Sequence, residues 1–496
     1  MFKSTSLKLA AALALVSSAI TAQAQDAGAL VDRLVKKGVL TAQEGEEVRA
    51  DMTRDFAATP AGKINISNSI TELKLYGDLR LRYQYDNKDG QLDPLPVGVH
   101  SDRNEKDRSP NSNQRSRWRF RLRLNAEARL TENFAAGVEL QTSQNSDSAN
   151  QTFENGFNDY GIFISRAYIS WTPTDWLTVV GGKFANPFYT TDLVWDADIN
   201  PNGLTESVAL HKLFAGSSEA GFSKDGKGYA PPIKEVYPWE LTLVAGQFIF
   251  DDNLEGGGRD NATRDNDQTT DAYLFETQLI GSYKFGNGIK LTVAPAWFTY
   301  VNGSVTGAEN ENSFNDSATV SGATRNLNLI LVPGDVAFKV GDLKTRFYWD
   351  FAYNIEGRKR VDEIYNVKTL RSAGIDPDDF DRRHNNLDNV AYLVGVQVGE
   401  NKKKGDWSAL LNWRRTGIGS VDPNLNDSDF ALGELNTQGI KAGVAYNFTD
   451  FCVFGVTYMH AWNLRGDLTG GEATGGNAIA DANAVQVLQV DLNVKF

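Results

Sequence analysis

Residues 115–130, RSRWRFRLRLNAEARL, alternate between two kinds of side chain with a period of two. Successive side chains of a β-strand point to opposite faces, so this pattern predicts a strand with one apolar and one basic face. A basic face this dense cannot be the core of a water-soluble sandwich. It fits a wall with lipid on one side and water on the other. The basic positions are Arg115, Arg117, Arg119, Arg121, Arg123 and Arg129.

Residues 73–85, LKLYGDLRLRYQY, repeat this design, with leucine and tyrosine on one face and Arg80 and Arg82 on the other. The pattern recurs along the chain and predicts sixteen strands, an even number, as bacterial outer-membrane barrels require. Besides 73–85 and 115–130, the strands are expected near 134–144, 160–171, 176–186, 204–214, 239–250, 272–285, 289–301, 323–340, 343–356, 389–399, 406–416, 438–448, 452–463 and 484–496. The segment 204–214 is the least regular, and its connection to the next strand is long.

The connections between these strands alternate in length. Short turns are expected at 131–133, 173–175, 286–288, 341–342, 401–405 and 449–450. Long loops rich in Asp, Asn and Gly are expected near 86–114, 145–159, 187–203, 251–271, 302–322, 357–388, 417–437 and 464–483. Short turns at one end and long loops at the other are typical of outer-membrane barrels. The predicted fold class is therefore all-β: a transmembrane antiparallel β-barrel of about 16 strands, with a short N-terminal helical segment.

Composition excludes several other classes of protein. The 496 residues contain one cysteine, so neither a disulfide framework nor a cysteine-rich metal cluster is expected. The net charge of −13 argues against a nucleic-acid-binding protein, which would carry a basic excess. No apolar run approaches the roughly 18 residues of a membrane-spanning helix.

The N-terminal region divides into two short parts before the barrel. Residues 1–24 carry Lys3 and Lys8, an apolar stretch and a small-x-small cleavage site at 22–24, which is typical of a signal peptide. Residues 25–60 predict two helices around Gly38, the second opened by a Thr41–Glu44 capping box. We expect this segment to be periplasmic, and either to associate with itself or the cell wall or to be a loosely packed extension. Residues 61–496 are then the barrel.

The last strand, LQVDLNVKF (488–496), ends in an aromatic residue on its apolar face. Such an ending resembles the assembly signal of Gram-negative outer-membrane barrels. GDLRLRYQY (77–85), RSRWRFRLRL (115–124), SRAYISW (165–171), GGKFANPF (181–188) and LVWDADINPNGL (193–204) together resemble the putative porin family. This resemblance implies a barrel and a pore but no particular solute. It also implies that Phe496 serves as the C-terminal assembly signal, read by the barrel assembly machinery.

The candidate functional residues lie on the face expected to line the lumen. By parity this face holds Arg80, Arg82, Arg115, Arg117, Arg119, Arg121 and Arg123. The third long loop carries Asp192, Asp196 and Asp198, and in general trimeric porins the third loop folds into the barrel. We expect these acids to face the arginine rows across a constriction, where rows of charge set ion selectivity. The alternative is that the arginines pair with wall acids such as Asp78, Glu127 and Glu139 and only stabilise the wall.

The sequence contains little that would indicate an enzyme. None of the four histidines has a partner at metal-ligand spacing, and no nucleophile elbow appears. We therefore expect no catalytic residues, no metal and no cofactor. The sequence shows no run of inward aromatic residues that would favour an aromatic path for sugars.

Together these features predict an outer-membrane porin for passive diffusion of small hydrophilic solutes and ions, with a charged constriction and an anion preference. The expected partners are outer-membrane lipid, the solutes themselves, and two further copies of the chain in a homotrimer. No nucleic acid is expected to bind. The alternative function is a surface adhesion or structural β-protein without channel activity.

Overall fold

The computed structural model describes residues 27–58, 67–89, 113–145, 147–153, 155–214, 238–251, 271–301, 324, 326–364, 387–464 and 483–496. The predicted signal peptide, residues 1–24, lies outside the described residues. So do most of the predicted loops 86–114, 251–271, 302–322, 357–388 and 464–483. The chain divides into two compact units; the first ends at Ile70 and the second begins at Thr71.

The first unit contains the helices α2 (Ala27–Lys36) and α3 (Ala42–Ala58). Gly38 ends the first helical stretch with a φ of +70°, a conformation that glycine adopts without strain. The expected capping box is present: the Thr41 amide donates to Glu44 Oε2 at 2.8 Å, and the Glu44 amide donates to Thr41 Oγ1 at 3.2 Å. No helix in the described part of the chain has both the length and the apolar character needed to cross a membrane.

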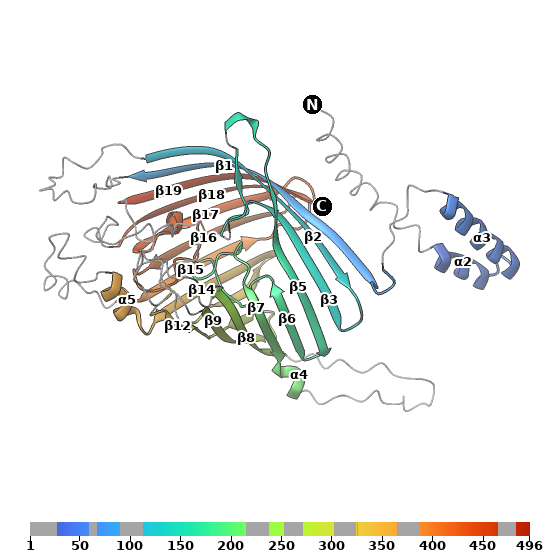
Figure 1. The fold of residues 1–496 in the computed structure, drawn as a ribbon, viewed down its shortest axis with the longest axis horizontal. Coiled ribbons are helices and arrows are strands. Elements are labelled where there is room, and N and C mark those ends of the chain that lie inside the picture. Colours follow the sequence, from blue (N-terminus) through green and yellow to red (C-terminus); the bar gives the residue numbers. More distant parts are fainter. Residues whose placement is uncertain are drawn as a thin grey trace, which may run out of the picture. The chain divides into compact units, whose positions relative to one another are not determined.

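The second unit is one antiparallel sheet of nineteen strand segments (Figure 1). These are β1 (Glu72–Asp89), β2 (Asn113–Arg129), β3 (Phe134–Thr142), β4 (Gln151–Thr152), β5 (Ile162–Thr174), β6 (Leu177–Lys183), β7 (Asn202–Ala209), β8 (Trp239–Asp251), β9 (Ala272–Lys284), β10 (Lys290–Val293), β11 (Ala296–Val301), β12 (Asn328–Leu331), β13 (Gly334–Val340), β14 (Leu343–Asn354), β15 (Val390–Gly399), β16 (Trp407–Thr416), β17 (Thr437–Asn447), β18 (Cys452–Asn463) and β19 (Ala484–Lys495).

The sheet closes into a barrel because β1 pairs with both β2 and β19. Two of its strands are each interrupted and therefore consist of two segments, β10 with β11 and β12 with β13. The break between β10 and β11 contains Pro295, and the break between β12 and β13 contains Pro333; proline has no amide hydrogen for the ladder. The two-residue β4 lies within a loop and pairs with β2 alone. The barrel therefore has sixteen spanning strands, which confirms the prediction.

Some segments differ from the predicted ranges. The doubtful strand at 204–214 is β7, which stops at Ala209, followed by the short helix α4 (Leu210–Phe214). The strand expected from 323 begins at Asn328. The loops also contain short helices, namely η4 (Asn155–Phe157), α5 (Gly357–Ile364) and η5 (Phe430–Gly433).

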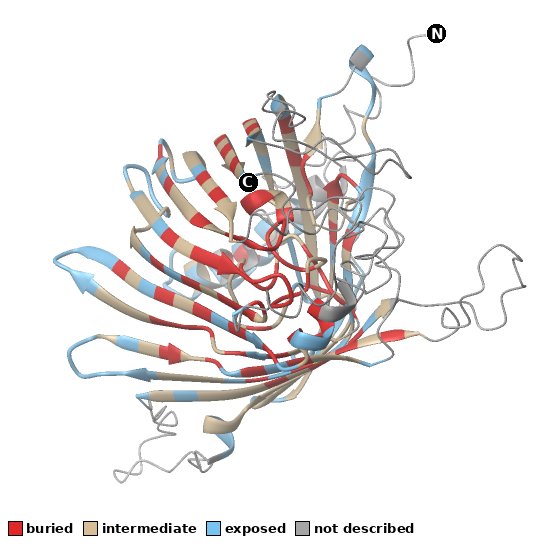
Figure 2. Ribbon diagram, turned by 90° about the vertical axis from the view of Figure 1, so that its left-hand side faces the viewer, coloured by how far each residue is buried: buried red, intermediate tan, exposed pale blue. Residues whose placement is uncertain are grey.

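Burial alternates along the strands and distinguishes the two faces of the wall (Figure 2). Leu79 and Trp118, on the predicted apolar faces, are 38% and 59% exposed, as expected for side chains that contact lipid. Arg82 and Arg119, on the opposite faces, are 4% and 9% exposed. The inward side of the barrel is therefore polar on β1 and β2 and is covered from within.

Candidate functional site in the barrel lumen

The loop between β6 and β7, residues 184–201, crosses the barrel interior. Tyr189 bonds to Gln278 of β9, and its hydroxyl donates to Asp335 of β13 at 2.8 Å. Thr191 donates to Asp350 of β14. Further along the same loop, other residues reach β16, β17, β2 and β5. Since these partners lie on all sides of a closed barrel, the loop spans the lumen, as the third loop was expected to do.

A second loop, residues 417–436 between β16 and β17, packs against the first. The Asp427 amide donates to the Asp192 carbonyl at 3.0 Å, and the Asp196 amide donates to the Leu425 carbonyl at 2.6 Å. The Ser428 amide and hydroxyl both donate to the Asp196 carboxylate, at 3.1 and 3.2 Å. No pattern in the sequence predicts that this loop also enters the barrel. The lumen therefore contains two joined loops, which we call the paired loops.

The paired loops cover an apolar half of the lumen. Their buried side chains include Leu193, Trp195 and Leu425. These pack against inward-facing residues of β8 to β15, among them Phe248 and Phe298. The sequence shows no run of inward aromatic residues along one strand, whereas the structure brings single inward aromatic residues of separate strands together here. The signal for an apolar interior was the stretch at 329–332, which is hydrophobic at odd and even positions alike and so predicts a strand whose inward face is also apolar.

The polar half of the lumen is formed by β1 and β2, with β19 beside them. The strand register places Arg80 opposite Arg121 and Arg82 opposite Arg119, so the two predicted rows lie side by side. Like charges directly opposite one another destabilise a sheet unless they are compensated. The arginines of these rows must therefore find partners in the wall or in the loops.

Aspartates compensate most of the two rows. Arg82 contacts Asp491 of β19 and Asp429 of the second loop, at 2.7 and 3.1 Å. Arg121 and Arg123 share Asp78 at 2.9 and 2.7 Å, and both lie 3.7 Å from Asp198 of the first loop. A further pair joins Arg117 to Asp86 at 2.9 Å. The rows thus pair with wall acids, as the alternative reading proposed, and with a loop acid, as the constriction reading proposed.

Within the part of the chain that the structure describes, three arginines of the rows form no ion pair with a carboxylate. Among the described residues, Arg80 has the Asn150 amide oxygen as its partner, at 2.5 Å. Arg119 donates to Gln84, to Ser148 and to the Asn150 carbonyl, all neutral groups. Arg115 is exposed. Within the described residues, four of the seven arginines contact five aspartates and three contact none, so seven positive charges face five negative ones there and the rows keep a positive excess.

The three predicted loop acids are placed differently from one another. Asp198 faces the arginine rows, as expected. Asp192 instead contacts Arg414 of β16 at 2.9 Å and Lys441 of β17 at 2.6 Å, on another part of the wall. Asp196 contacts the second loop through Ser428. For Asp192 and Asp196 the expected pairing with the rows is therefore not what the structure shows.

The ionisation of these loop acids follows from their neighbours. Burial opposes ionisation of Asp192, but the charges of Arg414 and Lys441 outweigh it and hold the pKa of its carboxyl below the usual range. Burial and the nearby carboxylates of Asp427 and Asp198 raise the pKa of Asp196 to about 8. Asp196 is thus largely protonated at neutral pH, which lets it lie close to other acids.

Sequence reading missed several charged residues of the lumen. Asp427 and Asp429 lie in a loop whose Asp and Asn content is typical of a loop exposed to solvent. Arg414 lies on β16, and its guanidinium also stacks on the Phe430 ring at 4.2 Å. Several of the contacts in this cluster join distant parts of the chain, as between Asp192 and Lys441, so no local pattern identifies them.

The predicted assembly signal can also be placed. Phe496 pairs with Gly77 through two main-chain hydrogen bonds of 2.7 and 3.0 Å, next to the seam of the barrel. A side chain at Gly77 would meet the Phe496 ring, so this glycine leaves room for it. Within the described residues, no group of three or more His, Cys, Asp or Glu side chains is arranged to hold a metal ion.

Comparison with known proteins gives one family. The family model described as putative porin matches residues 39–346 and 337–496. No curated protein matches the sequence. Among solved structures, OmpF of Salmonella typhi in complex with daunomycin has 10% identity and a TM-score of 0.42, over 87% of this chain and 100% of that chain. The anion-selective porin from Comamonas acidovorans has 12% identity and a TM-score of 0.41, over 86% and 99%. The outer-membrane channel DcaP of Acinetobacter baumannii has 12% identity and a TM-score of 0.40, over 87% and 99%.

Proposed function

The chain belongs to the putative porin family and is a porin-like outer-membrane channel, and we propose that it prefers small anions among the hydrophilic solutes and ions that diffuse through it. The family is not enzymatic, in agreement with the prediction from sequence. In the proposed channel, solutes pass between the arginine rows of β1 and β2 and the paired loops. The closed barrel and the family both favour a channel over the alternative of an adhesion protein without one.

The positive excess of the arginine rows carries the proposal. Arg80 and Arg119 donate to neutral groups, and no described carboxylate forms an ion pair with either of them. Arg117 and Arg123 keep 17% and 24% of their side chains exposed, so part of the rows faces water. Positive side chains along a pore favour anions, because low-dielectric walls strengthen the interaction between a fixed charge and a passing ion.

The experiment is a measurement of the zero-current potential of single channels in a planar bilayer under a KCl gradient. Replacing both Arg80 and Arg119 by glutamine should shift the potential toward cation preference, and no aspartate loses its partner. Arg129→Gln is the matched control, because Arg129 lies on β2 with the same parity but is 59% exposed at the other end of the strand. An unchanged potential in the double variant would refute the anion preference. No conductance from protein shown to be folded would refute the channel.

Assembly and location are further parts of the proposal. We propose that the channel is a homotrimer with its N-terminal helices in the periplasm, and that the barrel assembly machinery recognises its last strand. Light scattering of the purified protein in detergent tests the trimer. Protease accessibility of residues 27–58 in intact cells, compared with cells whose outer membrane has been opened, tests the location of the helices.

A further inference from the structure

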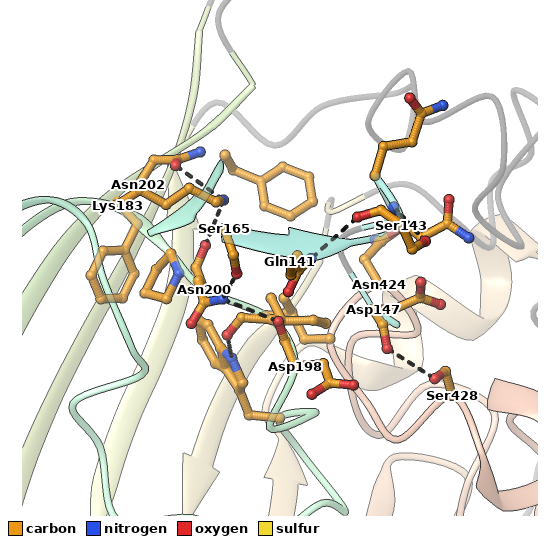
Figure 3. Close-up of a pocket in the computed structure, with 18 of the residues that line it drawn as sticks. Gln141, Ser143, Asp147, Ser165, Lys183, Asp198, Asn200, Asn202, Asn424 and Ser428 are labelled. Carbon is orange, nitrogen blue, oxygen red and sulfur yellow. Dashed lines mark hydrogen bonds between the residues drawn. The ribbon is translucent and has the colours of Figure 1, made fainter. Parts of the chain in front are cut away.

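A recess of about 340 Å³ lies where the paired loops meet the long-loop ends of β3, β5, β6, β8 and β9 (Figure 3). This volume is at the low end of ligand pockets, which span roughly 300–1,000 Å³, so the recess suits one small solute. Trp195 and Phe248 form part of its lining and are 4% and 2% exposed. The two rings pack edge to face, with centroids 6.2 Å apart, and give the recess an apolar floor.

Side-chain amides dominate the polar lining of the recess. They include Gln141, Gln144, Asn200, Asn202, Asn424 and Asn426. A carboxamide offers both donors and an acceptor, as a hydroxyl group does, so amides match a hydroxyl-rich solute in either direction of hydrogen bonding. Ser143, Ser165 and Ser428 add hydroxyl groups to the same surface.

One buried acceptor in this lining has no partner. Asn426 is 7% exposed, and its amide nitrogen donates to the Gly433 carbonyl at 3.3 Å. Its amide oxygen accepts no hydrogen bond from any described residue. This oxygen has almost no exposed surface, so a solute hydroxyl reaches it once the side chain turns toward the recess, and that bond would remove the roughly 1–3 kcal/mol that a buried acceptor without a partner costs.

Three charged residues line the recess, and two of them, Lys183 and Asp198, already have partners, whereas burial raises the pKa of the carboxyl of the third, Asp147. The Lys183 ammonium donates to the Asn200 carbonyl at 2.9 Å and to Asn202 Oδ1 at 3.3 Å. Asp198 faces Arg121 and Arg123. An anion would lose its hydration here without gaining a free cationic partner, and the burial that raises the pKa of Asp147 disfavours the ionised carboxylate that a cation would need, whereas a neutral solute pays no desolvation penalty for a charge.

We propose that this recess binds a neutral, polyhydroxylated solute of about monosaccharide size, as a subsite in the path of the channel. The proposal rests on the proposed function, because the solute reaches the recess through the lumen. The recess would recognise neutral solutes, a class that the arginine rows do not select because their charge acts on ions.

The test uses D-glucose and D-mannitol as probes of single channels in a planar bilayer containing KCl. Bound solute should reduce the ion current in a saturable way, and a polyethylene glycol of similar size, which has few hydroxyl groups, should not saturate. Asn426→Leu should raise the half-saturating concentration of glucose by about fivefold, the effect of one lost hydrogen bond. Gln144→Leu, at an exposed position on the rim, should raise it less and is a second variant with little risk to folding.

Asn125→Leu is the matched control, because Asn125 lies on the inward face of β2 but outside the recess. Saturable block by the sugars that is unchanged in both recess variants would overturn the proposal, and so would block that does not saturate. Calorimetric titration of the folded protein with glucose separates this outcome from failure of the channel. Saturable heat from a barrel that does not conduct would support the binding site and refute the channel. Conductance without saturable binding would support the channel and refute the binding site.

Discussion

Arg82, on the first strand of the barrel, donates two hydrogen bonds of 2.7 and 2.9 Å to Asp491 on the last strand. The two residues lie directly opposite each other in the register of β1 and β19. Their bidentate pair therefore joins the seam where the barrel closes, on its inward side. Arg82 is 4% exposed, so its charge depends on this partner and on Asp429.

Asp491→Leu should consequently destabilise the barrel. Removing one partner of a buried ion pair leaves an uncompensated charge and lowers the free energy of unfolding by about 3 kcal/mol. Urea unfolding of the protein in lipid vesicles, followed by heat-modifiable migration on a gel, measures the loss. The double variant Arg82→Met with Asp491→Leu should recover part of it, because no buried charge is then left alone. Equal stability of Asp491→Leu and the wild type would contradict the seam role.

Asp192→Asn should loosen the first of the paired loops. Asp192 joins that loop to Arg414 and Lys441, and Asp427 of the second loop contacts the same two cations at 3.1 and 3.2 Å. Without the Asp192 charge, Arg414, which is 2% exposed, keeps Asp427 alone as an anionic partner. The expected result is a larger and noisier single-channel current.

Asp175→Asn is the control for this variant, because Asp175 is an exposed acid in a short turn. It changes the net charge of the chain by the same amount without touching the paired loops. Identical current traces for the wild type and Asp192→Asn would show that this contact does not restrain the loop.

The raised pKa of Asp196 predicts a pH dependence of the paired loops. The folded protein holds this carboxyl protonated up to about pH 8, whereas the unfolded chain ionises it near its usual value of 3.8. The folded state therefore binds more protons between these limits, and this group's contribution to the free energy of unfolding falls as the pH rises from about 4 to about 8. Above that range the ionised carboxylate repels Asp427 and Asp198.

Current fluctuations should therefore increase between pH 7 and pH 9, as the contact between the loops weakens. Asp196→Asn keeps a neutral side chain of the same shape and should make the fluctuations independent of pH in this range. Single-channel recordings at matched ionic strength measure the effect. The same pH response in the wild type and Asp196→Asn would assign the titration to another group.

The sequence was informative about the two faces of the wall and much less so about the contacts inside the lumen, for a physical reason. Wall strands alternate between lipid and lumen, so residues such as Trp118 and Arg119 reveal their faces through a period of two. Loop contacts carry no period: Lys441 lies 249 positions from Asp192, and only the closed barrel brings them together. The arginine rows were predictable as a surface, but which of their charges remain unpaired depends on loop residues such as Asp429 and Asn150.

Gly182 and Gly203 mark the points where the first paired loop leaves and rejoins the wall, and they lie opposite each other in the register of β6 and β7. Their φ angles are +118° and +147°, which L side chains rarely adopt. A side chain at Gly182 would clash with the Ala167 carbonyl oxygen, and one at Gly203 with the Gln247 carbonyl oxygen.

Gly182→Ala and Gly203→Ala should therefore each destabilise the barrel, by about 1–3 kcal/mol from backbone strain alone. Each should also alter the channel current, because the loop would enter the lumen from a displaced origin. Urea unfolding and single-channel recording measure the two effects. Gly286→Ala, in the turn between β9 and β10 where an added side chain would meet nothing within 4 Å, is the matched control and should leave both unchanged. Equal stability and equal current for Gly182→Ala and Gly286→Ala would show that the close approach of the strands at the base of the first paired loop does not determine the position of that loop.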